Sequence, residues 1–115
     1  AARRAAALLE SPPGYHWEPK YLETDDGGLR LAYVDVPPAV ATDDGDGDAG
    51  DVDAPTVVCL HGMPTWGYLY RKVARALASG EHAPACRVVI PDALGFGRSS
   101  MLPQGAAAYA HDVHI

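Results

Sequence analysis

Alternating hydrophobic and polar positions predict a pair of short strands near the start of the chain. Residues 29–36 alternate with the period of two that a half-buried strand requires, and they include β-branched and aromatic side chains. Residues 21–24 form a shorter candidate strand, and the Asp-Asp-Gly-Gly run at 25–28 favours a turn between the two. We therefore expect a β-hairpin whose second strand ends before Pro37.

A more hydrophobic group of elements follows residue 55. Residues 56–60 are a continuous apolar run, typical of a strand buried on both faces, and residues 87–90 predict a second buried strand. Between them, residues 66–79 have helical spacing that ends at Gly80. The predicted helix carries Leu69, Val73, Ala76 and Leu77 on one side and Arg71, Lys72 and Arg75 on the other. This order predicts a βαβ unit with parallel strands and a right-handed crossover.

The length of 115 residues suits one domain of the α/β class. Residues 1–14 are predicted to form an N-terminal extension, helical over 1–10, and residues 15–115 the α/β unit, with a further helix over 106–115. The chain has no initial Met and stops as this last apolar pattern develops, so we expect a fragment. No apolar run is long enough to span a bilayer, which predicts a soluble protein; its compartment stays open, with the cytoplasm favoured.

The negative charge is concentrated in one segment. The chain has 9 Lys+Arg and 15 Asp+Glu, a net charge of -6, and this balance excludes a basic nucleic-acid-binding surface. Residues 39–55 hold six of the acidic residues and no basic one, so the rest of the chain is neutral overall. Asp44, Asp46 and Asp48 match the opening of an EF-hand loop, but Ala49 and Pro55 occupy its glycine and glutamate positions. We expect a solvated acidic insertion rather than a calcium site.

The candidate chemistry lies in the loop that follows the first buried strand. Ligands of open α/β sheets bind beyond the carboxyl ends of the strands, and residues 61–66, His-Gly-Met-Pro-Thr-Trp, occupy that place. Glycine permits a tight turn there, and proline fixes the backbone and lacks a competing donor. The free backbone N–H of Met63 is therefore the candidate donor to negative charge that develops during a reaction.

Other common sites are not found in the sequence. The run at 95–100 lacks the third glycine of the dinucleotide fingerprint, and no Walker phosphate loop or Gly-x-Ser-x-Gly nucleophile motif is present. His111 and His114 lack a further ligand, so we expect surface or packing histidines and no metal. Cys59 is expected in the core, and with Cys86 it makes neither a metal knuckle nor a disulfide framework.

Two segments around these loops carry a family resemblance. Residues 59–72, Cys-Leu-His-Gly-Met-Pro-Thr-Trp-Gly-Tyr-Leu-Tyr-Arg-Lys, closely resemble the segment after the third strand of haloalkane dehalogenases, which have the α/β-hydrolase fold. Residues 89–99 are similar to that family's fourth strand and the turn after it. Residues 21–23 and 28–35 are similar to its opening hairpin. His-Gly-x-Pro is shared by many α/β-hydrolases, whereas its continuation here is more specific and points away from epoxide hydrolases.

The resemblance implies the N-terminal part of an α/β-hydrolase fold, with an opening hairpin, a β-loop-α-β unit and an incomplete sheet. It also implies cleavage of carbon–halogen bonds, in which an Asp nucleophile forms an alkyl ester that a His-activated water hydrolyses. The nucleophile, base and acid would lie downstream, so no catalytic side chain is assigned here and the chain alone is expected to be inactive. The implied partners are water and a haloalkane or similar apolar electrophile, with no cofactor, metal, nucleic acid or membrane.

The resemblance assigns roles within the two loops. Met63 maps to one of the two backbone amides of the oxyanion hole, and the loop-shaping positions are His61, Gly62, Pro64 and Trp66. Asp92 maps to a structural turn residue rather than to the nucleophile. The thioether of Met63 departs from the Asn or Glu often found at this position, because it cannot donate a hydrogen bond.

Two alternatives to a dehalogenase stay open at this point. One is an epoxide hydrolase or another α/β-hydrolase, and the other is a non-catalytic α/β-hydrolase-like binding domain. The nucleophile elbow downstream would discriminate them: Asp-Trp favours a dehalogenase, Asp without that Trp an epoxide hydrolase, and no nucleophile a binding domain.

Overall fold

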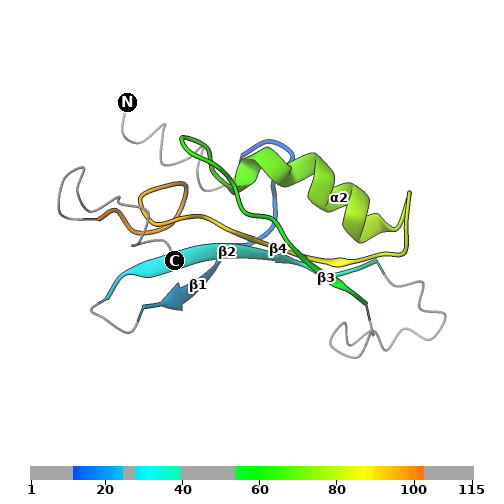
Figure 1. Ribbon diagram of the computed structural model, residues 1–115, viewed down its shortest axis with the longest axis horizontal. Coiled ribbons are helices and arrows are strands. Elements are labelled where there is room, and N and C mark those ends of the chain that lie inside the picture. Colours follow the sequence, from blue (N-terminus) through cyan, green and yellow to red (C-terminus); the bar gives the residue numbers. More distant parts are fainter. Residues whose placement is uncertain (1–11, 25–27, 40–53, 103–115) are drawn as a thin grey trace.

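The computed structural model describes residues 12–24, 28–39 and 54–102 (Figure 1). These residues form a sheet of four strands in the order β1-β2-β4-β3. The elements in chain order are β1 (Lys20–Glu23), β2 (Arg30–Val36), β3 (Thr56–Val58), the 3₁₀ helix η2 (Gly67–Tyr70), α2 (Arg71–Ser79) and β4 (Arg87–Pro91). The predicted α/β class is confirmed.

The predicted hairpin is confirmed. β1 and β2 are antiparallel, with Leu22 opposite Leu31, and the Thr24 amide donates to the carbonyl of Leu29 over 2.9 Å. β2 also pairs antiparallel with β4, with Val34 opposite Ile90. The hairpin is thereby joined to the second half of the sheet.

The predicted parallel pair is also confirmed. β3 and β4 run in the same direction, with Val57 opposite Val88, and η2 and α2 connect them. Pairing continues past the end of β3, because the Cys59 amide donates to the carbonyl of Val89 over 2.9 Å. The carboxyl ends of the two strands are therefore level with each other.

Helix α2 differs from the prediction in which side it buries. The helix ends at Gly80, as expected. The φ of Gly80 is 72°, the left-handed conformation that glycine adopts readily. However, the buried positions are Ala74 and Ala78, one helical turn apart, whereas Leu69 and Val73 are 54% and 48% exposed. The predicted apolar side was therefore wrong for Val73 and for Leu69, which lies in η2. Small side chains let α2 lie close to the sheet, and Leu77 of the predicted side does pack against the core.

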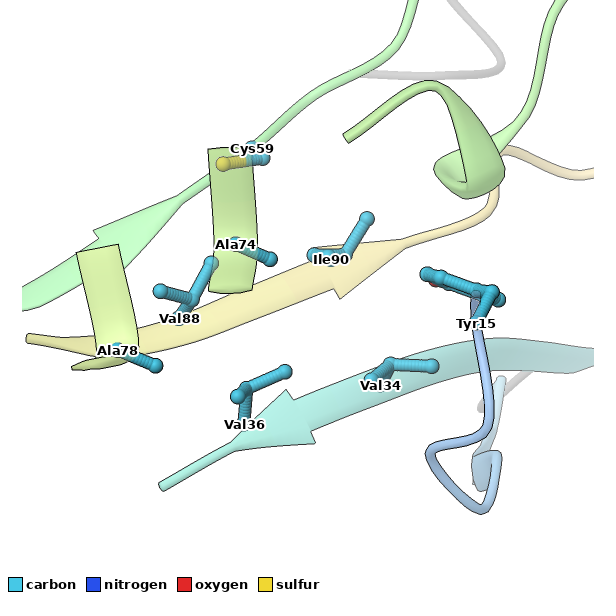
Figure 2. Close-up of a cluster of buried hydrophobic side chains, with 8 residues drawn as sticks. All are labelled: Tyr15, Val34, Val36, Cys59, Ala74, Ala78, Val88 and Ile90. Carbon is cyan, nitrogen blue, oxygen red and sulfur yellow. The ribbon is translucent and has the colours of Figure 1, made fainter. Parts of the chain in front are cut away.

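The hydrophobic core lies between α2 and one face of the sheet. Figure 2 shows side chains of β2 and β4 pointing toward the helix, with Tyr15 closing one end of the cluster. Its buried members are Tyr15, Val34, Val36, Cys59, Ala74, Ala78, Val88 and Ile90. Cys59 is thus a core residue, as predicted, and burial raises the pKa of its thiol.

The prediction that β3 is buried on both faces was wrong. Thr56 and Val58 are exposed, Val58 at 57%, and only Val57 packs against the core. The reason is topological, since β3 lies at an edge of the sheet that the structure describes and α2 covers a single face. β4 lies in the interior of that sheet, and its Val88 and Ile90 are fully buried.

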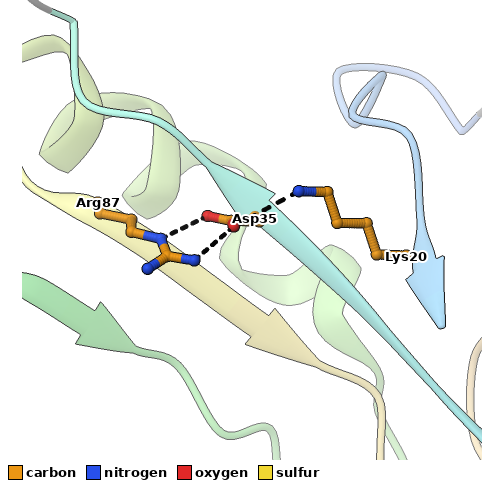
Figure 3. A network of polar contacts seen from close by, with 3 residues as sticks. All are labelled: Lys20, Asp35 and Arg87. Atoms are coloured by element: carbon orange, nitrogen blue, oxygen red, sulfur yellow. Dashed lines mark hydrogen bonds and ion pairs between the residues drawn. The ribbon is translucent and has the colours of Figure 1, made fainter. Parts of the chain in front are cut away.

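An ion cluster crosses the opposite face of the sheet (Figure 3). Arg87 donates through Nε and Nη2 to the two carboxylate oxygens of Asp35, over 2.8 and 2.6 Å, and Lys20 Nζ lies 3.6 Å from Asp35 Oδ2. The Arg87 hydrogen bonds and positive charge hold the pKa of Asp35 below its ordinary value. The cluster links β1, β2 and β4.

Several predictions concern residues outside the described ranges. They are the helices over 1–10 and 106–115, the acidic insertion beyond residue 39, the EF-hand-like aspartates, and His111 with His114. Within the described ranges, no helix is long and apolar enough to cross a membrane.

Candidate active site

Two loops lie side by side where the parallel strands end. The Met63 loop (residues 61–66) follows β3, and the post-β4 turn (residues 92–100) follows β4. In Figure 1 both loops lie toward the same end of the sheet, on the left of the view. Ligand sites of open α/β sheets occur at this carboxyl edge, so the fold places the loops where the sequence predicted a site.

The Met63 loop is built around a tight turn. The amide and hydroxyl of Thr65 donate to the carbonyl of Gly62 over 3.0 and 2.6 Å, with Met63 and Pro64 between them, joined by a cis peptide bond. Met63 is 60% exposed. Among the described residues, none accepts a hydrogen bond from the Met63 amide. This N–H lies outside regular secondary structure and is free to serve a ligand.

His61 connects the Met63 loop to the post-β4 turn. The Ala93 amide donates to His61 Nε2 over 2.9 Å, so Nε2 carries no proton and the ring hydrogen is on Nδ1. Nδ1 lies 3.1 Å from the carbonyl of Gly62, which accepts that hydrogen. The ring also packs edge-on against Phe96. His61 cannot accept a proton at Nε2 without losing the Ala93 hydrogen bond, so its geometry suits a structural role better than that of a base.

Asp92 is buried at the start of the post-β4 turn, with 4% of the residue exposed. Its Oδ1 accepts the Gly67 amide over 2.7 Å, and its Oδ2 accepts the Arg98 amide over 3.1 Å. Both carboxylate oxygens are therefore engaged by backbone amides. A buried carboxylate in this state cannot attack a substrate, which agrees with the structural interpretation of this residue.

The main chain of Asp92 is equally well held. Its amide donates to the carbonyl of Ala32 over 2.8 Å, and its carbonyl accepts the Ser99 hydroxyl over 2.5 Å. The same hydroxyl oxygen accepts the Ala32 amide over 2.8 Å. The turn is thus fixed to β2 as well as to η2.

An aromatic layer lies beside the Asp92 carboxylate. Trp66 stacks on Tyr68 with ring centroids 5.6 Å apart, and Tyr15 meets both rings edge-on. The guanidinium of Arg98 lies 5.3 Å from the centre of the Tyr15 ring. Burial, and then the nearby Asp92 charge, raise the pKa of the Tyr15 phenol far above its ordinary value, so this hydroxyl stays protonated.

The described part of the chain contains no group of three His, Cys, Asp or Glu side chains placed to hold a metal ion. At the candidate site it offers the backbone N–H of Met63, on a well-anchored loop, as a donor. Sequence reasoning identified that loop and, by resemblance, gave Asp92 a structural role, but it did not predict the hydrogen bonds by which Asp92 and Ala93 anchor the loop. The sequence signals for these anchors are the position of Asp92 directly after a buried strand and the family resemblance of residues 89–99.

The sequence model of the alpha/beta hydrolase fold family matches residues 55–114, which include β3, α2, β4 and both loops. The chain belongs to the alpha/beta hydrolase fold family. The predicted fold, an opening hairpin followed by a β-loop-α-β unit, is the arrangement described above for this α/β-hydrolase.

Similar proteins include dehalogenases. A haloalkane dehalogenase of Mycobacterium marinum is 36% identical over 116 residues, which cover 98% of this chain and 33% of the relative. The tetrameric haloalkane dehalogenase DpaA of Paraglaciecola agarilytica is 35% identical with a TM-score of 0.65, covering 89% of this α/β-hydrolase chain and 29% of that one. These similarities confirm the resemblance to haloalkane dehalogenases.

An epoxide hydrolase from metagenomes of hot environments also has a similar structure. It is 28% identical with a TM-score of 0.59, and the match covers 85% of this chain and 26% of that one. The α/β-hydrolase chain thus spans a third or less of the length of these relatives.

Proposed function

We propose that the protein carrying this chain is a haloalkane dehalogenase-like hydrolase, and that the Met63 amide is one of its oxyanion donors. The observation that carries the proposal is the free Met63 N–H on an anchored turn beyond the carboxyl ends of β3 and β4. The haloalkane dehalogenases that match nearly all of this chain support the substrate class.

The proposed reaction has two steps. A carboxylate displaces halide from an alkyl carbon, forming an alkyl–enzyme ester and releasing the halide ion. Water then gives its proton to a histidine base and attacks the ester carbonyl; the tetrahedral intermediate collapses to the alcohol and the free carboxylate. Nucleophile, base and acid are proposed to lie beyond residue 115. Negative charge builds on the carbonyl oxygen only in the second step, and that is the charge the Met63 amide would stabilise.

The Met63 side chain takes no part in halide binding under this proposal, because a thioether has no hydrogen to donate. Trp66 is packed between Tyr15 and Tyr68 and is assigned to supporting the loop. The halide donors are therefore proposed to come from the segments that supply the catalytic residues.

An epoxide hydrolase is the second candidate, favoured by the structural neighbour of that activity. Its proposed chemistry also passes through an ester on an Asp, so the Met63 amide would serve the same oxyanion. The two functions differ only in the leaving group that the rest of the protein must stabilise.

The first experiment measures products from the full-length protein that contains residues 1–115. With 1-bromobutane, we expect bromide and butanol in equal amounts. Diol formed from styrene oxide without bromide release from 1-bromobutane would favour the epoxide hydrolase, and no product from either would favour a binding domain. The 115-residue chain alone is expected to release no bromide.

The second experiment removes the Met63 N–H. Replacing Met63 with its 2-hydroxy acid analogue keeps the side chain but exchanges the amide for an ester. We expect kcat to fall by about 10²–10³, the usual effect of losing one oxyanion donor. The matched control is the same exchange at Ala83, an exposed residue between α2 and β4. Equal activity of the two variants would contradict the assignment of Met63.

A further inference from the structure

We propose that Asp92 is a positioning residue that holds the Met63 amide in place for hydrolysis of the alkyl–enzyme ester. This inference rests on the proposed function and extends it to a side chain that touches no substrate. The carboxylate acts through the backbone at the far end of the Met63 loop.

The first step of the argument is where the loop is anchored. At its start, the His61 ring accepts the Ala93 amide over 2.9 Å. Directly after its end, at the first residue of η2, the Gly67 amide donates to Asp92 Oδ1 over 2.7 Å. The two anchors are consecutive residues of the post-β4 turn, so this turn clamps both ends of the loop that carries the Met63 amide.

The second step is that Asp92 is itself rigidly held. Its Oδ2 accepts the Arg98 amide, and its main-chain N–H and C=O bond to Ala32 and to the Ser99 hydroxyl. A Cβ atom on Gly97 would lie 2.6 Å from Asp92 Cγ, so the turn closes directly on the carboxylate. The Asp92 side chain is therefore closely packed as well as hydrogen-bonded.

The third step is the effect of Asp92→Asn. The carboxamide keeps the shape of the carboxylate but has one oxygen and one NH₂ group. Gly67 and Arg98 each present a backbone donor, so one of them would face the NH₂ and lose its acceptor inside a buried site. If the NH₂ faces Gly67, the exit of the Met63 loop loosens; if it faces Arg98, the post-β4 turn that holds the Asp92 side chain loosens. In both cases the Met63 donor is held less firmly, and a misplaced donor stabilises a transition state poorly.

The expected kinetic signature separates this role from a general loss of structure. The displacement step builds no oxyanion, so formation of the ester keeps its rate, while hydrolysis slows by about tenfold or more. The variant should release one bromide per active site in a burst and then turn over slowly, with a butyl group retained on the protein. A variant that is simply less folded would give a smaller burst and no retained butyl group.

The test uses the full-length protein, 1-bromobutane, rapid-quench bromide measurement and intact-protein mass spectrometry. Asp35→Asn is the matched control, because it alters an aspartate on the opposite face of the sheet and is expected to leave the kinetics unchanged. If Asp92→Asn does not fold, glycolic acid at position 67 removes the same hydrogen bond from the donor side and keeps the Asp92 charge.

Slower hydrolysis with accumulated butyl-enzyme, in either variant, supports the positioning role. If the wild-type enzyme is active but the variants hydrolyse the ester at the normal rate, or slow both steps equally, the positioning role of Asp92 is overturned. The proposed function is not affected by that result. Failure of the wild-type protein to release bromide would overturn the proposed function and this inference with it.

Discussion

Gly67 lies so close to Asp92 that a Cβ atom at position 67 would stand 2.8 Å from the carboxylate oxygen Oδ1. The same atom would stand 2.8 Å from Ile90 Cγ2 and from the Tyr15 hydroxyl. All three neighbours belong to buried residues, so none of them can move aside freely. Glycine at position 67 is therefore required by the approach of η2 to the end of β4.

We predict that Gly67→Ala lowers the free energy of unfolding by about 2 kcal/mol, because the added methyl group must displace buried atoms. Urea denaturation of the full-length protein measures the effect. Gly62→Ala is the matched control: a Cβ there would meet nothing within 4 Å, and we expect a change within about 0.5 kcal/mol. Equal effects of the two substitutions would contradict this view of η2.

The ion cluster predicts a stability difference that depends on pH. Asp35 has a lowered pKa in the folded protein, so its contribution is fully present above its ordinary pKa of 3.8 and is lost as pH falls through the lowered folded value. We expect Asp35→Asn to lower the melting temperature by about 1–3 °C at pH 7. The difference from wild type should narrow progressively below pH 3.8.

Thermal melts of both proteins across this pH range provide the measurement. Glu81→Gln, which alters an exposed carboxylate just after α2, is the control and should show no such narrowing. A wild-type advantage that stayed constant at acid pH would mean that the charge of Asp35 is not the source of its contribution.

Because β3 lies at an exposed edge of the described sheet, we expect Val58→Lys to have opposite effects in the 115-residue chain and in the full-length protein. In the 115-residue chain alone, Val58→Lys should reduce aggregation, because a charge on an edge strand opposes pairing between copies. In the full-length protein, where we propose that further sheet lies beside β3, the same charge should be buried and lower the melting temperature by several degrees.

Size-exclusion chromatography of the chain and thermal melts of the full-length protein test this prediction. Leu22→Lys on β1, at the other edge, is the control, since it should improve solubility without lowering the melting temperature. A full-length Val58→Lys protein as stable as wild type would contradict the placement of sheet beside β3.

The sequence predicted the elements better than it predicted their surroundings. The period-two pattern of β2 was sufficient because Val34 and Val36 face α2, as the alternation required. The apolar run of β3 predicted the strand correctly but not the burial of its side chains, because hydrophobicity does not reveal which strand lies at an edge. The predicted burial of Leu69 and Val73 was wrong for a related reason. The sheet-facing side of α2 is fixed by how closely Ala74 and Ala78 approach the sheet.

The candidate site was predictable in part for a similar reason. The Gly and Pro of the Met63 loop predict a turn from the local sequence, and the turn is present. The anchors are not local: Asp92 lies 25 residues from Gly67, and Ala93 lies 32 residues from His61. They meet only because Val58 pairs with Val89 and brings the two strand ends level, a register that no periodicity in the sequence encodes.

The attachment of the Met63 loop to two consecutive residues has a mechanical consequence. Since Asp92 and Ala93 are joined by a single peptide unit, the loop's entry and exit cannot be displaced independently. A shift of the post-β4 turn would act on both ends of the loop at once. Motion of the Met63 loop is therefore coupled to the tip of β4 through these two hydrogen bonds.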